Sequence, residues 1–125
     1  MKLEYIPDGC VDCPLIRLFE FDRNEALAFK SLLEQLRDGR QQVALHQEPF
    51  IQPIGNCRLT FKQSTSDLGI LLDGPGFECS LTPEAWDGLV FWVEPFCNSD
   101  SGSYQWLPTP GRRKINLLFS RNGQW

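Results

Sequence analysis

The sequence contains a single histidine, His46. One imidazole excludes every site that needs two, such as a three-histidine zinc centre or a His-Glu-x-x-His motif. The chain also lacks a Walker phosphate-binding loop, a Gly-x-Gly-x-x-Gly fingerprint after a strand and a Gly-x-Ser-x-Gly nucleophile elbow. The sequence therefore gives no support to the common nucleotide-dependent or serine-hydrolase chemistries.

Long apolar runs are also missing. None approaches the roughly 20 residues that a membrane span requires, and the first eight residues, MKLEYIPD, lack the apolar stretch of a signal peptide. With 125 residues, 42% of them hydrophobic, the chain has the size and composition of one compact domain over residues 1–125. We expect a cytoplasmic protein that needs no metal or disulfide merely to fold.

Basic residues are absent between Gln63 and Gly111, although the whole chain carries 12 of them against 16 acidic residues, for a net charge of −4. The acidic residues of this stretch are Asp67, Asp73, Glu78, Glu84, Asp87, Glu94 and Asp100. Such a balance disfavours a nucleic-acid partner. Two interpretations remain: the acidic stretch folds against the basic cluster at 112–114, or it attracts a basic protein.

The five cysteines form no recognisable framework. An odd number in a chain without a signal peptide favours reduced thiols. Cys10 and Cys13 have the spacing of a zinc half-site, but a four-thiolate site usually repeats that spacing, and the other three cysteines are single. We therefore expect no cofactor, with zinc at Cys10 and Cys13 as the weak alternative. Cys57 and Cys79 are predicted to be small buried apolar residues.

Two helices are predicted from capping signals. Asp22 and Glu25 have capping-box spacing, and the helix that they open should end near Arg37 or Asp38, before Gly39. Its apolar stripe is Phe29, Leu32, Leu33 and Leu36, with Leu27 on the exposed side. The second helix should begin at Thr82-Pro83-Glu84 and end near Glu94, because Pro95 would disrupt an interior turn.

Strand patterns fall at 15–21, 43–45, 57–62, 68–72, 77–81, 104–107 and 114–120. Their short connections predict sequential antiparallel neighbours. We therefore expect a single α+β domain: a mainly antiparallel sheet of about five to seven strands with two helices packed against it, preceded by an irregular segment over 1–14. Residues 19–24 and 77–82 resemble one another, but the match is too short to establish a duplication.

Catalytic chemistry has little support. Cys57 or Cys97 could approach His46, yet no local motif favours a Cys–His pair. Paired carboxylates on a solvated helix face would keep ordinary acidity, whereas a catalytic acid generally needs burial. We predict no catalytic residue.

The second helix carries the most informative pattern. Its core stripe is predicted to comprise Trp86, Leu89, Val90 and Val93, widened by Ala85, Trp92 and Phe96. Phe91 projects about 140° from Trp86, in the sector of Glu84, Asp87 and Glu94. An exposed aromatic residue beside carboxylates has the composition of a binding hot spot. The competing interpretations are a stray surface Phe, or one covered by the loop 98–103.

These observations favour a small non-catalytic protein-binding module, of the inhibitor, immunity or adaptor type, that presents Phe91, Asp87, Glu84 and Glu94 to a basic partner. One alternative is a cysteine-centred zinc domain or a small Cys/His enzyme. Another is a self-associating structural protein in which Leu27, Phe91 and Trp125 are buried between identical subunits.

Overall fold

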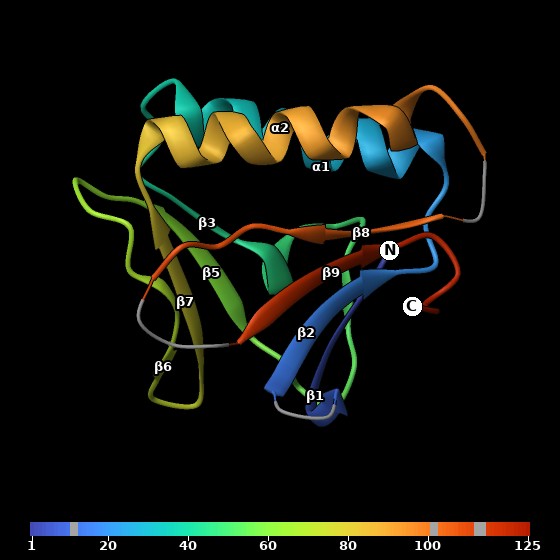
Figure 1. Ribbon diagram of the computed structural model, residues 1–125, viewed down its shortest axis with the longest axis horizontal. Helices are drawn as coiled ribbons and strands as arrows, with labels where there is room; N and C mark the ends of the chain where they lie inside the picture. Colours follow the sequence, from blue (N-terminus) through green and yellow to red (C-terminus); the bar gives the residue numbers. More distant parts are fainter. Residues whose placement is uncertain (11–12, 101–102, 112–114) are drawn as a thin grey trace.

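The computed structural model describes residues 1–10, 13–100, 103–111 and 115–125, and of residues 9, 10 and 13 the backbone alone. Two helices lie side by side as one layer, and two β-sheets lie beneath them (Figure 1). This confirms an α+β domain with two helices packed on strands. The helices are antiparallel, because Lys30 contacts Glu94 whereas Arg37, further along the first helix, contacts Asp87.

The described residues contain two helices, α1 (Arg23–Arg37) and α2 (Pro83–Cys97), and nine strands: β1 (Lys2–Cys10), β2 (Cys13–Phe19), β3 (Gln42–Ala44), β4 (Gln52–Pro53), β5 (Leu59–Gln63), β6 (Gly69–Asp73), β7 (Gly76–Leu81), β8 (Tyr104–Leu107) and β9 (Asn116–Ser120). A single 3-10 turn, Leu45–Gln47, follows β3. One sheet has the order β4-β1-β2-β9-β8 and the other β3-β5-β7-β6.

The described strand pairs are mainly antiparallel, as expected, but the single sheet of sequential neighbours predicted from the sequence is wrong, since the strands form two sheets. Both sheets are mixed: β2 pairs with β9, β5 with β7 and β1 with β4 in parallel. The short connection between β5 and β6 predicts that they pair, but β6 pairs with β7 and lies at the edge of the sheet among the described strands. The irregular segment expected over 1–14 is also wrong, since Lys2–Cys10 is a strand bonded to both β2 and β4.

Local signals set the helices as expected. The Asp22 carboxylate accepts from the Glu25 N–H at 2.8 Å, the Glu25 carboxylate accepts from the Asp22 N–H, and Gly39 has φ +122°. Thr82 caps α2 through the Ala85 N–H. The expected end of α2 at Glu94 is wrong: the helix includes Pro95 and reaches Cys97. Proline removes one backbone hydrogen bond and crowds the carbonyl four residues before it, but the final turn also buries Phe96 and Cys97, which offsets that cost.

The two halves of the chain repeat one topology. Each contributes an antiparallel strand pair, a 15-residue helix and a second antiparallel pair. The last two strands of the second half, β8 and β9, join β1 and β2 of the first half. In the same way, β3 and β5 of the first half join β6 and β7 of the second. The two sheets therefore have the matching orders β1-β2-β9-β8 and β6-β7-β5-β3. Buried positions also repeat: Ala26, Phe29, Leu33 and Leu36 in α1, and Trp86, Leu89, Val93 and Phe96 in α2. The halves therefore stabilise each other through exchanged strands.

The core is continuous between the helix layer and both sheets. Phe29 stacks on Phe119 at 5.1 Å and meets Phe61 edge-on at 6.2 Å, so α1 joins strands of the two sheets. Trp86 contributes the corresponding contact from α2, with its ring 4.8 Å from Phe61 and its indole N–H bonded to the Lys62 carbonyl. These aromatic contacts join the helix layer to strands of both sheets.

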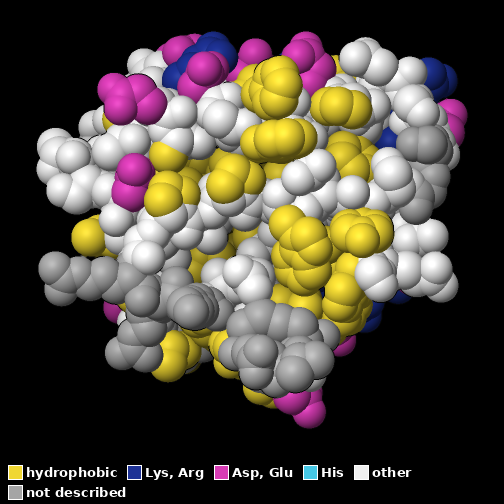
Figure 2. Space-filling model, viewed as in Figure 1, with side chains coloured by type: hydrophobic (Ala, Val, Ile, Leu, Met, Phe, Trp, Pro, Cys, Tyr) yellow, Lys and Arg dark blue, Asp and Glu magenta, His cyan; other side chains and the backbone are white. Residues whose placement is uncertain are grey.

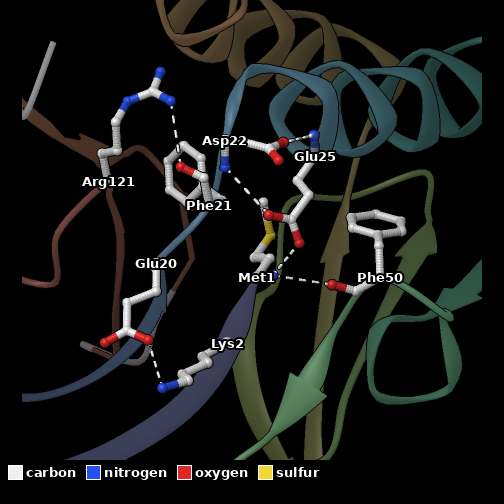
Figure 3. A network of polar contacts seen from close by, with 8 residues as sticks. All are labelled: Met1, Lys2, Glu20, Phe21, Asp22, Glu25, Phe50 and Arg121. Carbon is white, nitrogen blue, oxygen red and sulfur yellow. Dashed lines mark hydrogen bonds and ion pairs between the residues drawn. The ribbon is translucent and has the colours of Figure 1, made fainter. Parts of the chain in front are cut away.

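The first residue, Met1, is held against the N-terminal end of α1 (Figure 3). The Met1 ammonium group bonds to the Glu25 carboxylate and, at 3.0 Å, to the Phe50 carbonyl. Glu25 thus serves both the ammonium group and the helix cap at Asp22. Because the Met1 side chain is fully buried, these contacts hold the beginning of β1 against α1.

No described helix is both long and apolar enough to cross a membrane.

Candidate functional site

Phe91 lies on the outer face of α2 and is 66% exposed. The same helix turns Trp86, Leu89 and Val93 toward the sheets, where all three are fully buried. Because residues of a helix are about 100° apart, this arrangement leaves Phe91 facing solvent, as its position predicts. The described residues of the loop 98–103, which was considered as its cover, leave this side chain largely exposed.

Trp92 was expected in the core, and that expectation is wrong: its side chain is 41% exposed. Among the described residues, the sheets cover α2 from below and α1 covers one of its flanks, and Trp92 occupies the other flank. Its ring meets Phe91 edge-on, with ring centroids 5.2 Å apart. The two aromatic side chains therefore form one exposed pair instead of a single isolated ring.

A shallow groove of about 460 Å³ adjoins this pair. It is lined by Phe91, Trp92, Glu94, Pro95 and Asn98. Figure 2 shows hydrophobic side chains gathered over α2, and again beneath it near β8, with acidic side chains along the upper edge of the helix layer. We call Phe91, Trp92 and Pro95 the α2 patch. It provides an apolar surface with a depression that can receive a side chain.

Of the three predicted carboxylates, Glu94 lines the groove, and the three differ in their partners. Asp87 accepts a 3.1 Å bond from Arg37, and Glu94 accepts a 3.2 Å bond from Lys30. Glu84, also exposed, forms no ion pair with a described residue. The acidic character of this face is thus concentrated at Glu84, near the start of α2, because α1 compensates the other two acids.

The ion pairs shift the pKa values of their basic partners. Hydrogen bonding to Glu94, outweighing the effect of burial, raises the pKa of Lys30. Bonds to Asp38 and, second, Asp87 raise the pKa of Arg37. Arg37 in turn lowers the pKa of Asp38. The counter-charges to this part of the acidic stretch therefore come from α1, while the basic cluster 112–114 considered for that role lies outside the described residues.

The described cysteines do not have the surroundings of a nucleophile. Cys57, Cys79 and Cys97 are buried free thiols, and burial raises the pKa of all three, that of Cys57 to about 11. A reactive cysteine needs the opposite shift. The ring of His46 is engaged at Nδ1, which accepts the Leu59 N–H at 3.2 Å. These features give no support to a Cys–His enzyme.

The weak zinc candidates cannot be placed as ligands. Cys10 and Cys13 are paired in the register of β1 and β2, but their side chains lie outside the described residues. Among the side chains that the structure does describe, no group of three His, Cys, Asp or Glu residues could hold a metal ion.

Helical periodicity predicts the exposed position of Phe91 but not the exposure of Trp92 or the place of Pro95 inside the helix. The same periodicity places Trp92 in the core stripe, and Pro95 predicts the end of the helix. The sequence does contain an indication that Trp92 is exposed. Trp92 lies at the margin of the apolar stripe, about 140° around the helix from Asp87, which faces α1. Only the one-sided packing of α2 decides that such a margin is exposed.

A scan against protein-family models, a search of curated proteins and a search of solved structures each found no match to this chain.

Proposed function

We propose that this chain is a small, non-catalytic protein-binding module, of the inhibitor, immunity or adaptor type, that binds a basic protein partner through the outer face of α2. The observation that carries the proposal is the exposure of Phe91 and Trp92 as a contacting pair beside a groove. Large aromatic side chains dominate binding energy at protein interfaces, and an exposed pair on a rigid helix loses little conformational freedom on binding.

The acidic residues exposed on α2 favour a basic partner. Glu84, Asp87 and Glu94 all lie on the exposed side of α2, and the chain carries a net charge of −4. Asp87 and Glu94 already contact Arg37 and Lys30. Basic side chains of a partner therefore gain most attraction from Glu84, and they can also replace Arg37 and Lys30 in these weak, exposed ion pairs. Charge then contributes mainly to the rate of association, and the aromatic pair to the lifetime of the complex.

The first test compares Phe91→Ala with Leu72→Ala. The two parent side chains are 66% and 67% exposed, but Leu72 lies on β6, away from the helix layer (Figure 1). Proteins retained from a lysate of the source cells by the immobilised chain are quantified for each variant. We expect at least one basic protein to be retained by the parent and by Leu72→Ala but lost with Phe91→Ala.

The second test uses that protein in purified form. We expect Phe91→Ala to weaken its affinity by at least about tenfold, and Glu84→Lys to slow its association several-fold at low salt. The control Asp73→Lys changes net charge equally at the β6–β7 turn. If no retained protein depends on Phe91, or if Asp73→Lys acts as strongly as Glu84→Lys, the α2 face is not the binding site.

A further inference from the structure

A cleft of about 350 Å³ lies between the two sheets, away from the helix layer. Its walls come from three parts of the chain: β1, the turn 54–58 and the β6–β7 hairpin. This volume lies within the range of small-molecule sites, which often form where separate structural units meet. The cleft is separate from the α2 patch and shares no residue with it.

Aromatic and aliphatic side chains supply much of the cleft surface. Tyr5 and Phe77 come from different sheets and meet there, with ring centroids 4.6 Å apart. Ile54 and Leu72 line the cleft as well, and Leu72 is 67% exposed. A flat apolar molecule would cover these side chains and contact an aromatic wall.

The turn at the cleft is held in one conformation. The Cys57 N–H donates to the Ile54 carbonyl at 3.2 Å, and the Ile54 N–H donates to the Leu3 carbonyl of β1 at 2.8 Å. Gly55 and Asn56 between them have φ values of +61° and +59°, the geometry of a type I′ turn. Glycine and asparagine tolerate this left-handed backbone, so the wall is formed without a ligand.

The uncompensated charge of the cleft is positive. Glu4 lines it, but the Arg17 Nε–H donates to the Glu4 carboxylate at 2.8 Å. Arg58 forms no ion pair with any described residue. Asp73 lines the adjoining hollow of about 230 Å³, which also contains Arg58, and does not line the cleft itself. In an acidic protein, this cation at an aromatic cleft favours an anionic ligand.

We propose that the inter-sheet cleft binds a small planar aromatic carboxylate. The ring would cover the apolar wall of Tyr5, Phe77 and Leu72, and the carboxylate would pair with the Arg58 guanidinium. The Asn56 side chain, also on the cleft, can donate an additional hydrogen bond to the carboxylate. This site is independent of the proposed protein-binding function.

The probe is 1-naphthoate, titrated into the ¹⁵N-labelled full chain and followed by NMR chemical shifts. We expect shifts centred on residues 5, 54–58, 72 and 77, with a dissociation constant below about 1 mM. 1-Naphthamide, which has the same ring but no charge, and cyclohexanecarboxylate, which has the charge but no aromatic ring, should each bind at least about fivefold more weakly.

Two substitutions complete the test. Arg58→Gln should weaken 1-naphthoate binding at least about fivefold and leave 1-naphthamide binding unchanged. The control Arg40→Gln removes an exposed arginine that follows α1 and bonds to Gln35. This variant and Phe91→Ala should both leave the affinity for 1-naphthoate unaltered. The proposal is overturned if 1-naphthoate causes no shifts at millimolar concentration, if the shifts centre on Phe91 and Trp92, or if Arg58→Gln binds like the parent.

Discussion

The Arg37 guanidinium donates to the Asp87 carboxylate at 3.1 Å and so joins the last turn of α1 to the second turn of α2. The Lys30–Glu94 pair repeats this cross-helix contact two turns away. Both carboxylates are more than half exposed. The acids expected to face a partner therefore also bridge the helix layer, and the two roles can be separated by measurement.

The first prediction concerns the stability that these bridges provide. Asp87→Asn should lower the free energy of unfolding by less than about 1 kcal/mol, because exposed ion pairs are screened by solvent. Urea unfolding of Asp87→Asn, Arg37→Gln and the double variant gives the coupling energy directly. A cost above about 2 kcal/mol would show that Asp87 mainly stabilises the contact between the two helices.

A second prediction contrasts two tryptophans of α2. Trp86 is fully buried and its indole N–H bonds to the Lys62 carbonyl, whereas Trp92 is 41% exposed. Trp86→Ala should cost about 3–5 kcal/mol, since it leaves a cavity and removes the hydrogen bond to the Lys62 carbonyl. Trp92→Ala should cost no more than about 1 kcal/mol. Chemical unfolding measures both, and equal costs would contradict the one-sided packing of α2.

Two glycines provide a third prediction. At Gly88, within α2, a Cβ atom would meet nothing within 4 Å, so Gly88→Ala should stabilise the protein by about 0.5–1 kcal/mol. At Gly111 the Cβ atom would lie 2.3 Å from the Leu68 carbonyl oxygen. Gly111→Ala must therefore shift the backbone and should cost about 1–3 kcal/mol. Thermal unfolding compares them, and a stabilising Gly111→Ala would contradict this close approach.

The fourth prediction concerns alkaline pH. Burial, with a smaller contribution from Glu4, raises the pKa of Cys57 to about 11. The unfolded thiol ionises at lower pH than the folded one, so the contribution of Cys57 to stability is complete below about pH 8 and is lost as the pH rises to about 11. The loss is on the order of 2 kcal/mol.

Other groups also titrate above pH 9, so the useful quantity is a difference. Unfolding free energies of the parent and Cys57→Ala should be compared at pH 7 and pH 10.5. The parent should lose more stability over this interval than the variant. An equal loss would show that the Cys57 thiol ionises as readily in the folded protein as in the unfolded chain.

The repeated topology explains why the pairing of the strands was not predicted from the sequence. Strand patterns located most of the strands, but partners such as β2 and β9 are about a hundred residues apart. The alternation of side chains along a strand does not indicate which other strand pairs with it. Short connections favour pairing between strands that follow one another in the chain, whereas here each half also pairs some of its strands with strands of the other half. The first strand was missed entirely because its residues, including Pro7 and Gly9, lack regular alternation.

The sequence by itself determined where the helices start, which sides of them are apolar and that Phe91 points outward, because caps and helical periodicity act over a few residues. Tertiary structure decided the rest: which strands pair, which flank of α2 is left open at Trp92, which cations of α1 meet its acids, and which residues form the inter-sheet cleft. These depend on segments distant along the chain coming into contact, and no local pattern specifies such contacts.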